Sequence, residues 1–177
     1  MMPTLGYALL ICAFASSAIS IALGTVGFLS RNRVAKVNDL VRIARACSMA
    51  CTAFLIGCCA ILVYCFLAGD VSILYVLEER SLSTGTLAWL FKIAGLWAGR
   101  SGSLLFWTTL IAVFNFIIVV NSRKHETSLD NVAITIVQVV ITVFVGILLF
   151  SAGNMPFEPT PERFFTETGE LTSAASL

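Results

Sequence analysis

Four long runs of apolar residues, separated by shorter polar segments, dominate the chain. They cover roughly residues 5–29, 46–69, 103–121 and 131–152, and no Lys, Arg, Asp, Glu or His interrupts any of them. Each run is close to the ~20 residues that a helix needs to cross the hydrocarbon core of a bilayer. The pattern therefore predicts an all-α integral membrane protein built as a bundle of four transmembrane helices.

The first run has an alternative interpretation as a signal peptide. Residues 1–7 contain no basic side chain, and the apolar stretch is longer than the usual core of such peptides. We therefore expect a retained span.

Composition supports the membrane class. Of the 177 residues, 58% are hydrophobic and 12% are charged, and the mean hydropathy is +0.94. A soluble domain of this length could not bury so much apolar surface, so the lipid bilayer is the expected solvent. The formal charge is +1 and the basic residues lie beside the spans, which excludes a nucleic-acid-binding surface.

The loops predict the orientation. The segment between the first two spans carries one acid, Asp39, and five basic residues: Arg31, Arg33, Lys36, Arg42 and Arg45. Such an excess of positive charge favours the cytoplasmic side. The segment with Arg123 and Lys124 then also lies inside, while residues 70–102 and 154–177 lie outside. We expect a multi-pass inner-membrane protein with both termini outside.

The outer segments have further features. Residues 86–98 are apolar with Lys92 embedded and are too short to span, which predicts a helix lying in the outer interface. Trp89, Trp97 and Trp107 suit that level, although tryptophans there often form only an aromatic belt. Residues 1–153 thus form a membrane domain, and the acidic, proline-containing residues 154–177 an extended, water-exposed tail.

The spans offer few groups for chemistry. Cys51, Cys58 and Cys65 repeat every seven residues on one helix face, where small side chains favour close helix packing. A metal or redox role is the alternative, but the chain has no CxxC pair and only one histidine, His125, in a loop. We therefore predict no catalytic residues and no metal site. Asn115 and Gln138 are expected to form an interhelical hydrogen bond between the third and fourth spans.

Two outer segments carry a resemblance. The first contains Lys92, the run Trp97-Ala98-Gly99-Arg100-Ser101-Gly102-Ser103, and Trp107. It resembles the outer-loop signature of the CcmF-type cytochrome c haem lyases, in which a lysine-containing helix leads into Trp-Gly-Gly-His-Glu-Gly-Ser and then Leu-Leu-Leu-Trp. The second, around Asn154, Pro156 and Phe157, is similar to the Ser-Asn-Pro-Phe-Glu segment after the fourth span of that family.

The match includes two departures. Arg100 stands where the family has His, and Ser101 where it has Glu. Any role of that His and Glu therefore has no support in this chain. We call the first set of candidates the outer motif and the second the tail motif. The outer motif comprises Lys92, Trp97, Gly99, Arg100, Gly102, Ser103 and Trp107, and the tail motif comprises Asn154, Pro156 and Phe157.

The resemblance implies a function in cytochrome c maturation. It implies the amino-terminal part of a haem lyase, itself non-catalytic or incomplete, that takes part in periplasmic haem attachment. Haem would bind transiently and mainly to a second membrane chain with a tryptophan-rich platform; a haem chaperone and apocytochrome c would be the other partners. Aromatic faces and cations such as Lys92 and Arg100 suit the haem ring and its propionates.

Two alternatives remain open. A structural scaffold or assembly subunit without haem contact would need only the packing of the spans. A small transporter is disfavoured, because the spans contain none of the ionisable groups that ion-coupled transporters usually keep at membrane depth.

Overall fold

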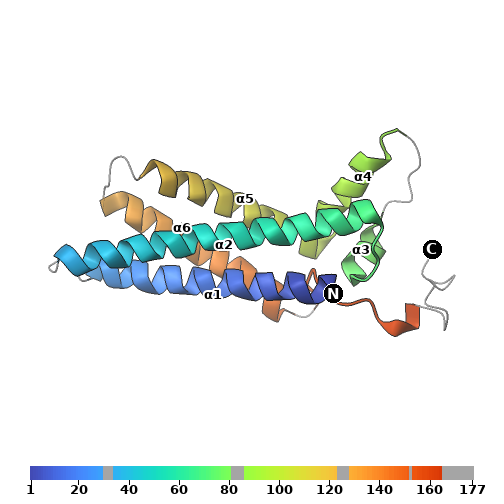
Figure 1. Cartoon of the computed structure of the whole chain (residues 1–177), viewed down its shortest axis with the longest axis horizontal. Coiled ribbons are helices and arrows are strands. Elements are labelled where there is room, and N and C mark those ends of the chain that lie inside the picture. Colours follow the sequence, from blue (N-terminus) through green and yellow to red (C-terminus); the bar gives the residue numbers. More distant parts are fainter. Residues whose placement is uncertain (30–33, 81–85, 123–127, 152, 165–177) are drawn as a thin grey trace.

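The computed structural model describes residues 1–29, 34–80, 86–122, 128–151 and 153–164. The four long helices run side by side (Figure 1): α1 (Met2–Leu29), α2 (Val34–Ala68), α5 (Arg100–Asn121) and α6 (Ser128–Phe150). The shorter elements are α3 (Leu74–Glu79), α4 (Ala88–Ala94) and the 3₁₀ turns η1 (Gly95–Trp97) and η2 (Glu162–Phe164). The described residues contain no strand, only one isolated antiparallel bridge between Ile73 and Pro159.

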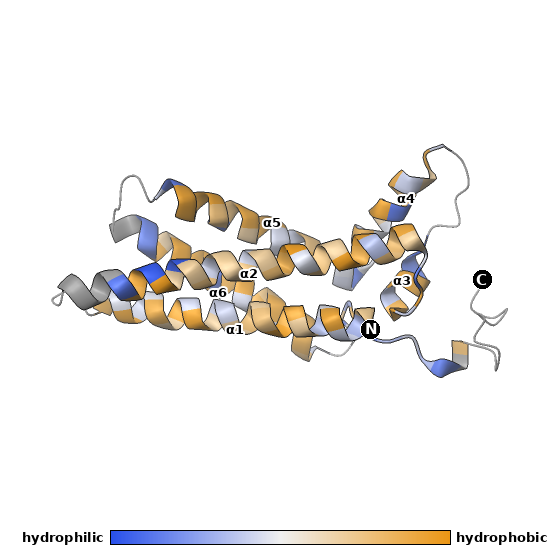
Figure 2. Cartoon of the chain, viewed as in Figure 1, coloured by the Kyte–Doolittle hydropathy of each residue, from blue (hydrophilic) through white to orange (hydrophobic). Residues whose placement is uncertain are grey.

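Each of the four long helices is apolar and long enough to cross a membrane. Between 22% and 39% of the residues in the most apolar stretch of each helix are buried, so much of every helix faces outward. The outward side chains include large apolar groups such as Phe114 and Phe150, and Figure 2 shows apolar residues along the four helices. The predicted all-α membrane bundle is confirmed, and the protein is a multi-pass membrane protein.

The helices close into a ring in which α1 packs against α2 and α6, and α5 packs against α6 and α2. The amino terminus, α3, α4 and residues 153–164 lie at one end (Figure 1). We call this the motif end, and the opposite end, with Arg42 and Arg45, the basic end.

Small residues allow the helices to approach closely in the core. Cys51, Cys58 and Cys65 are each 0% exposed, which confirms the predicted packing face of α2. Ser20 of α1 donates a hydrogen bond to the carbonyl of Ala44 of α2 at 2.8 Å. Close contact of this kind supplies dispersion energy that lipid cannot replace.

A buried polar cluster links the third and fourth long helices. The Asn115 amide donates to Oε1 of Gln138 at 2.9 Å, which confirms the predicted interhelical bond. The same amide donates to the hydroxyl of Ser48 on α2 at 2.9 Å, a partner that the sequence did not indicate. Because the three residues are nearly or fully buried, the cluster fixes how α2, α5 and α6 sit against one another.

The second long helix begins earlier than the apolar run. It starts at Val34, about a dozen residues before position 46, so Arg42 and Arg45 lie on a helix and not in a loop. Hydropathy locates the membrane-spanning part, whereas arginine, lysine and alanine continue a helix into the water. Arg45 is also buried, and its guanidinium donates to Oδ1 of Asn131 at 2.9 Å and 3.2 Å.

The segment between α2 and α5 is more structured than expected. Residues 88–97, within the predicted 86–98 helix, form α4 and η1. None of the residues of α4 is buried, and Trp89 and Phe91 are more than half exposed. The position of this helix at the membrane interface remains a prediction. The helix α3 was not predicted, because six residues are too few to show a helical period.

Candidate functional site

One buried tyrosine organises the motif end. Tyr75 lies on α3, whose neighbours Ile73 and Val76 are buried in the core and hold the helix against the bundle. Its hydroxyl donates to the carbonyls of Gly95 (3.0 Å) and Leu96 (3.2 Å) and accepts the N–H of Gly99 (3.1 Å). The turn between η1 and α5 is therefore tied to α3 through one phenol group.

The outer-motif glycines make room for this tyrosine. A Cβ at Gly102 would overlap the Tyr75 hydroxyl and the carbonyl of Leu96. A Cβ at Gly99 would come within 2.5 Å of a carboxylate oxygen of Glu79 and 2.7 Å of the Tyr75 ring. These two positions are glycine because helix, turn and phenol ring meet there, which is a structural reason.

Burial controls the ionisation of the same tyrosine. It raises the pKa of Tyr75 to about 12, and the negative charge of Glu79 adds to the rise, while backbone hydrogen bonds oppose it. The phenol therefore stays protonated at neutral pH and keeps its donor function.

The remaining outer-motif residues begin and flank α5. Ser103 donates its hydroxyl to the carbonyl of Trp97 at 2.7 Å, which fixes the end of η1. The Trp97 ring lies 5.4 Å from that of Phe106, and Phe106 lies 5.9 Å from Trp107. Trp97 is 46% and Trp107 60% exposed, so the three rings form an aromatic surface open to a ligand, a partner or lipid.

Arg100 joins the outer motif to the tail motif. It is exposed, and its Nη2 donates to the carbonyl of Gly153 at 3.0 Å, beside Asn154. Gly153 has φ of 72°, a left-handed conformation that glycine adopts without strain. Lys92 lies on α4 and is half-buried. One hydrogen bond from Arg100 thus connects the outer motif to Gly153, the residue before the tail motif.

The beginning of the tail is folded onto the bundle. Phe157 is 1% exposed and packs on Gly6 of α1, where a Cβ would overlap its ring. Backbone bonds join Leu74 to Glu158 (2.9 Å) and Thr160 to Ser72 (3.0 Å). The prediction of a water-exposed arm is therefore wrong for Pro156 and Phe157, which are buried. The acidic residues and prolines led to that prediction, whereas the buried ring of Phe157 holds the beginning of the tail against the bundle.

The motif end presents side chains of types that suit binding. Exposed aromatic faces and the cations Arg100 and Lys92 lie on this side, and within the described residues no group of three His, Cys, Asp or Glu side chains could hold a metal ion. His125 lies outside the described residues.

Comparison with known proteins identifies the relationship. No family model matches the chain. Over 152 residues it is 31% identical to the cytochrome c-type biogenesis protein CcmF of Pseudomonas aeruginosa, a match that covers 86% of this chain and 22% of the relative. A probable cytochrome c-type biogenesis protein NrfE of Escherichia coli is 30% identical over 90 residues, or 51% of this chain and 15% of the relative. The chain belongs to the CcmF-type family of cytochrome c biogenesis proteins.

The fold agrees with this family. A solved structure of the cytochrome c haem lyase CcmF superposes with a TM-score of 0.74 over 89% of this chain and 25% of that chain, at 21% sequence identity. This chain therefore spans about a fifth of the length of the CcmF proteins it matches.

Sequence reasoning missed Tyr75, the residue that holds the outer motif in place. It lies on the short helix α3, outside the four spans. Phe157 was named in the tail motif, but its burial against Gly6 was not predicted. The one sequence signal for Tyr75 was an aromatic residue between the apolar neighbours Leu74 and Val76, a setting in which aromatic side chains are often buried.

Proposed function

We propose that this chain is the amino-terminal part of a cytochrome c haem lyase and takes part in periplasmic haem attachment. In that reaction the haem vinyl groups form thioether bonds with the reduced cysteines of a Cys-x-x-Cys-His motif in apocytochrome c. The similarity to CcmF over 86% of the chain is the observation that carries the proposal. No bond-forming group is assigned to this chain.

The motif end is the proposed contact region for haem. Trp97 and Trp107 would offer aromatic faces to the porphyrin edge, and Lys92 and Arg100 would offer cations to its propionates. Arg100 already donates through Nη2 to Gly153, so a propionate would share this guanidinium with the tail turn. Haem would be held transiently here and mainly by a second membrane chain with a tryptophan-rich platform.

The proposed topology follows from charge. The basic end carries Arg42 and Arg45, which favours the cytoplasmic side of the inner membrane. The motif end, the amino terminus and the tail would then face the periplasm, where a haem chaperone and apocytochrome c are the proposed further partners.

A structural scaffold without haem contact is the second candidate. It is favoured by the packing of Gly99 and Gly102 around Tyr75, because the chain's own fold accounts for both glycines. The two proposals differ in what they require of the exposed aromatic residues.

A cytochrome c maturation assay on the chain in its native membrane, together with its partners, separates the candidates. Trp107→Ala is compared with Trp89→Ala, since the two tryptophans are 60% and 53% exposed and only Trp107 belongs to the outer motif. The haem-lyase proposal expects holocytochrome yield to fall by about tenfold with Trp107→Ala, the loss of ~1.4 kcal/mol of contact, and to hold with Trp89→Ala. Unchanged yield in both variants would favour the scaffold.

Co-purification tests the partner. A tagged chain extracted in mild detergent should bring down a tryptophan-rich multispan protein and show a Soret band. A colourless sample without such a protein would contradict the haem-lyase proposal.

A further inference from the structure

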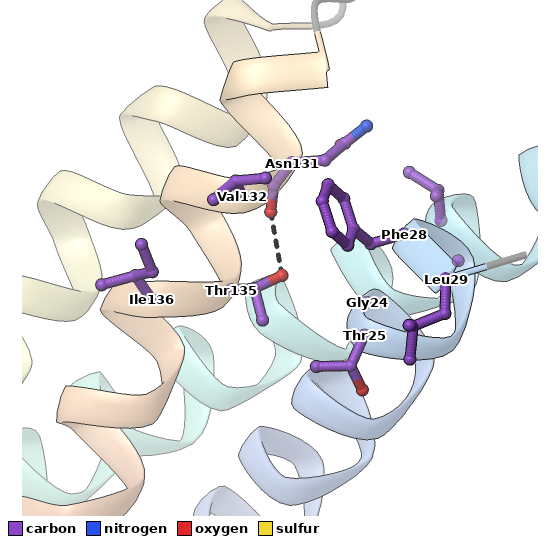
Figure 3. Close-up of a pocket in the computed structure, with 10 residues that line it drawn as sticks. Gly24, Thr25, Phe28, Leu29, Asn131, Val132, Thr135 and Ile136 are labelled. Carbon is purple, nitrogen blue, oxygen red and sulfur yellow. Dashed lines mark hydrogen bonds between the residues drawn. The ribbon is translucent and has the colours of Figure 1, made fainter. Parts of the chain in front are cut away.

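A side pocket lies near the basic end of the bundle. Its volume is about 460 Å³, and it is formed between the last turns of α1 and the first turns of α6 (Figure 3). The main lining residues are Phe28 and Leu29 of α1, Val41 of α2, and Val132, Thr135 and Ile136 of α6. The size falls within the roughly 300–1,000 Å³ of small-molecule pockets.

The pocket is open at the surface of the bundle. Phe28, Leu29 and Ile136 line it and are 58%, 81% and 59% exposed, and they lie near the end of α1 and the beginning of α6, two of the candidate spans. An apolar molecule in the bilayer can reach such a pocket without crossing water.

The interior suits a hydrocarbon. The hydroxyl of Thr25 donates to the carbonyls of Ile21 and Ala22, both at 2.9 Å, and that of Thr135 donates to the carbonyl of Asn131 at 2.8 Å. Both hydroxyls that line the pocket thus direct their hydrogens to their own helices (Figure 3 shows the Thr135 bond). A polar ligand would lose its hydration there and gain few bonds in return.

One wall of the pocket ends at a buried cation. Asn131 lines the pocket, and its Oδ1 accepts hydrogen bonds from Nε and Nη2 of Arg45, which is 7% exposed. Arg42 is exposed on α2, next to the lining residue Val41. An apolar interior with one guanidinium behind the Asn131 wall, and a second arginine one position along α2 from a lining residue, is complementary to an amphiphile with an anionic head.

We infer that this pocket binds one acyl chain of an anionic phospholipid, with the lipid phosphate at the Arg42 and Arg45 side. Basic pockets between transmembrane helices on the cytoplasmic side are a known setting for such lipids. The site is far from the motif end, and the inference does not depend on haem handling. A partner helix filling the pocket is the competing occupant.

Contact quenching by brominated lipid tests the inference. The full chain, with its native tryptophans replaced (Trp89→Phe, Trp97→Phe and Trp107→Phe), receives one reporter at the pocket, Phe28→Trp. The matched control is Ile19→Trp, which is on the same helix, 49% exposed and outside the pocket lining. Each is reconstituted in phosphatidylcholine vesicles with equal mole fractions of brominated phosphatidylglycerol or brominated phosphatidylcholine.

The expected result is a preference of about fivefold for the anionic lipid at position 28 and none at position 19. Adding Arg42→Gln should reduce the preference at position 28, and adding Thr25→Phe, which fills the pocket, should abolish it. Circular dichroism and unchanged quenching at position 19 verify that these variants fold. Equal quenching by both lipids at position 28 would overturn the inference, and so would quenching weaker than at position 19, which would show a pocket closed to lipid.

Discussion

Removal of a single oxygen at Tyr75 should loosen the turn that carries the outer motif. Tyr75→Phe keeps the ring and its edge-on contact with Phe66, with ring centroids 5.9 Å apart, and deletes only the hydroxyl. That hydroxyl serves the carbonyls of Gly95 and Leu96 and the N–H of Gly99, and a backbone hydrogen bond from Gly102 also reaches it. The variant therefore separates fastening of the turn from packing of α3.

The magnitude follows from the groups left without a partner. The carbonyl of Gly95 keeps a second donor, the N–H of Ala98 at 3.4 Å, so its loss is small. The carbonyl of Leu96, a 4% exposed residue, and the N–H of Gly99 lose the Tyr75 bond. Unsatisfied buried backbone groups cost ~1–3 kcal/mol each, and with partial relaxation of the turn we expect about 2–3 kcal/mol in total.

Amide hydrogen exchange measures this locally. The Gly99 amide of the chain in lipid nanodiscs should exchange about 30- to 150-fold faster in Tyr75→Phe, which corresponds to about 2–3 kcal/mol of lost protection. Tyr64→Phe is the control, because Tyr64 is 56% exposed on α2. Exchange of Gly99 that stays within about threefold of the unmodified chain, or rises equally in both variants, would refute the assignment of Tyr75 as the fastening residue.

Four further predictions test other parts of the structure. The pKa of Tyr75 rises from 10.0 to about 12 on folding, so the contribution of the protonated phenol to stability is present below pH 10 and is lost between pH 10 and about 12. Over that window up to ~3 kcal/mol of unfolding free energy should disappear in the unmodified chain, and this loss should be absent in Tyr75→Phe. Gly102→Ala should destabilise by about 1–3 kcal/mol in reversible unfolding, because the new methyl overlaps the Tyr75 hydroxyl. Phe157→Ala should cost ~3–5 kcal/mol of unfolding free energy and make the tail sensitive to protease, and unchanged protease resistance would contradict the anchoring role of this ring. Asn115→Ala should lower stability by only ~0.6–2 kcal/mol, because Gln138 can find partners in the unfolded membrane state; a larger loss would indicate a stronger cluster.

The spans were predictable because the bilayer imposes a simple rule. A helix must hide its backbone and present about twenty apolar residues, and both requirements are visible in the sequence. The heptad spacing of Cys51, Cys58 and Cys65 likewise predicted a packing face, since α-helical geometry alone determines which residues share a side. The bond between Asn115 and Gln138 was predictable because they are the main amide side chains well inside the spans.

The motif end was less predictable because long-range contacts determine it. Nothing local to Phe157 indicates that a glycine about 150 residues earlier, Gly6, leaves space for its ring. Nothing near Gly99 indicates that its N–H is bonded to a phenol on a six-residue helix. Glycines, prolines and acids predicted irregular, solvated backbone, and the actual turn is fixed by a few side chains from other elements.

The residues of the outer motif meet two different requirements. Gly99, Gly102 and Ser103 are needed by the turn itself, so their presence agrees equally with a haem-handling chain and with a scaffold. Trp97 and Trp107 are 46% and 60% exposed, so about half of the surface of each is not used in packing within this chain. Two indoles held at the end of η1 and the start of α5 therefore carry more functional information than the glycines. If another chain supplies the axial ligand of haem, the haem-lyase proposal requires this chain to offer aromatic contact and does not require the His of the family motif. The scaffold alternative requires no exposed aromatic surface.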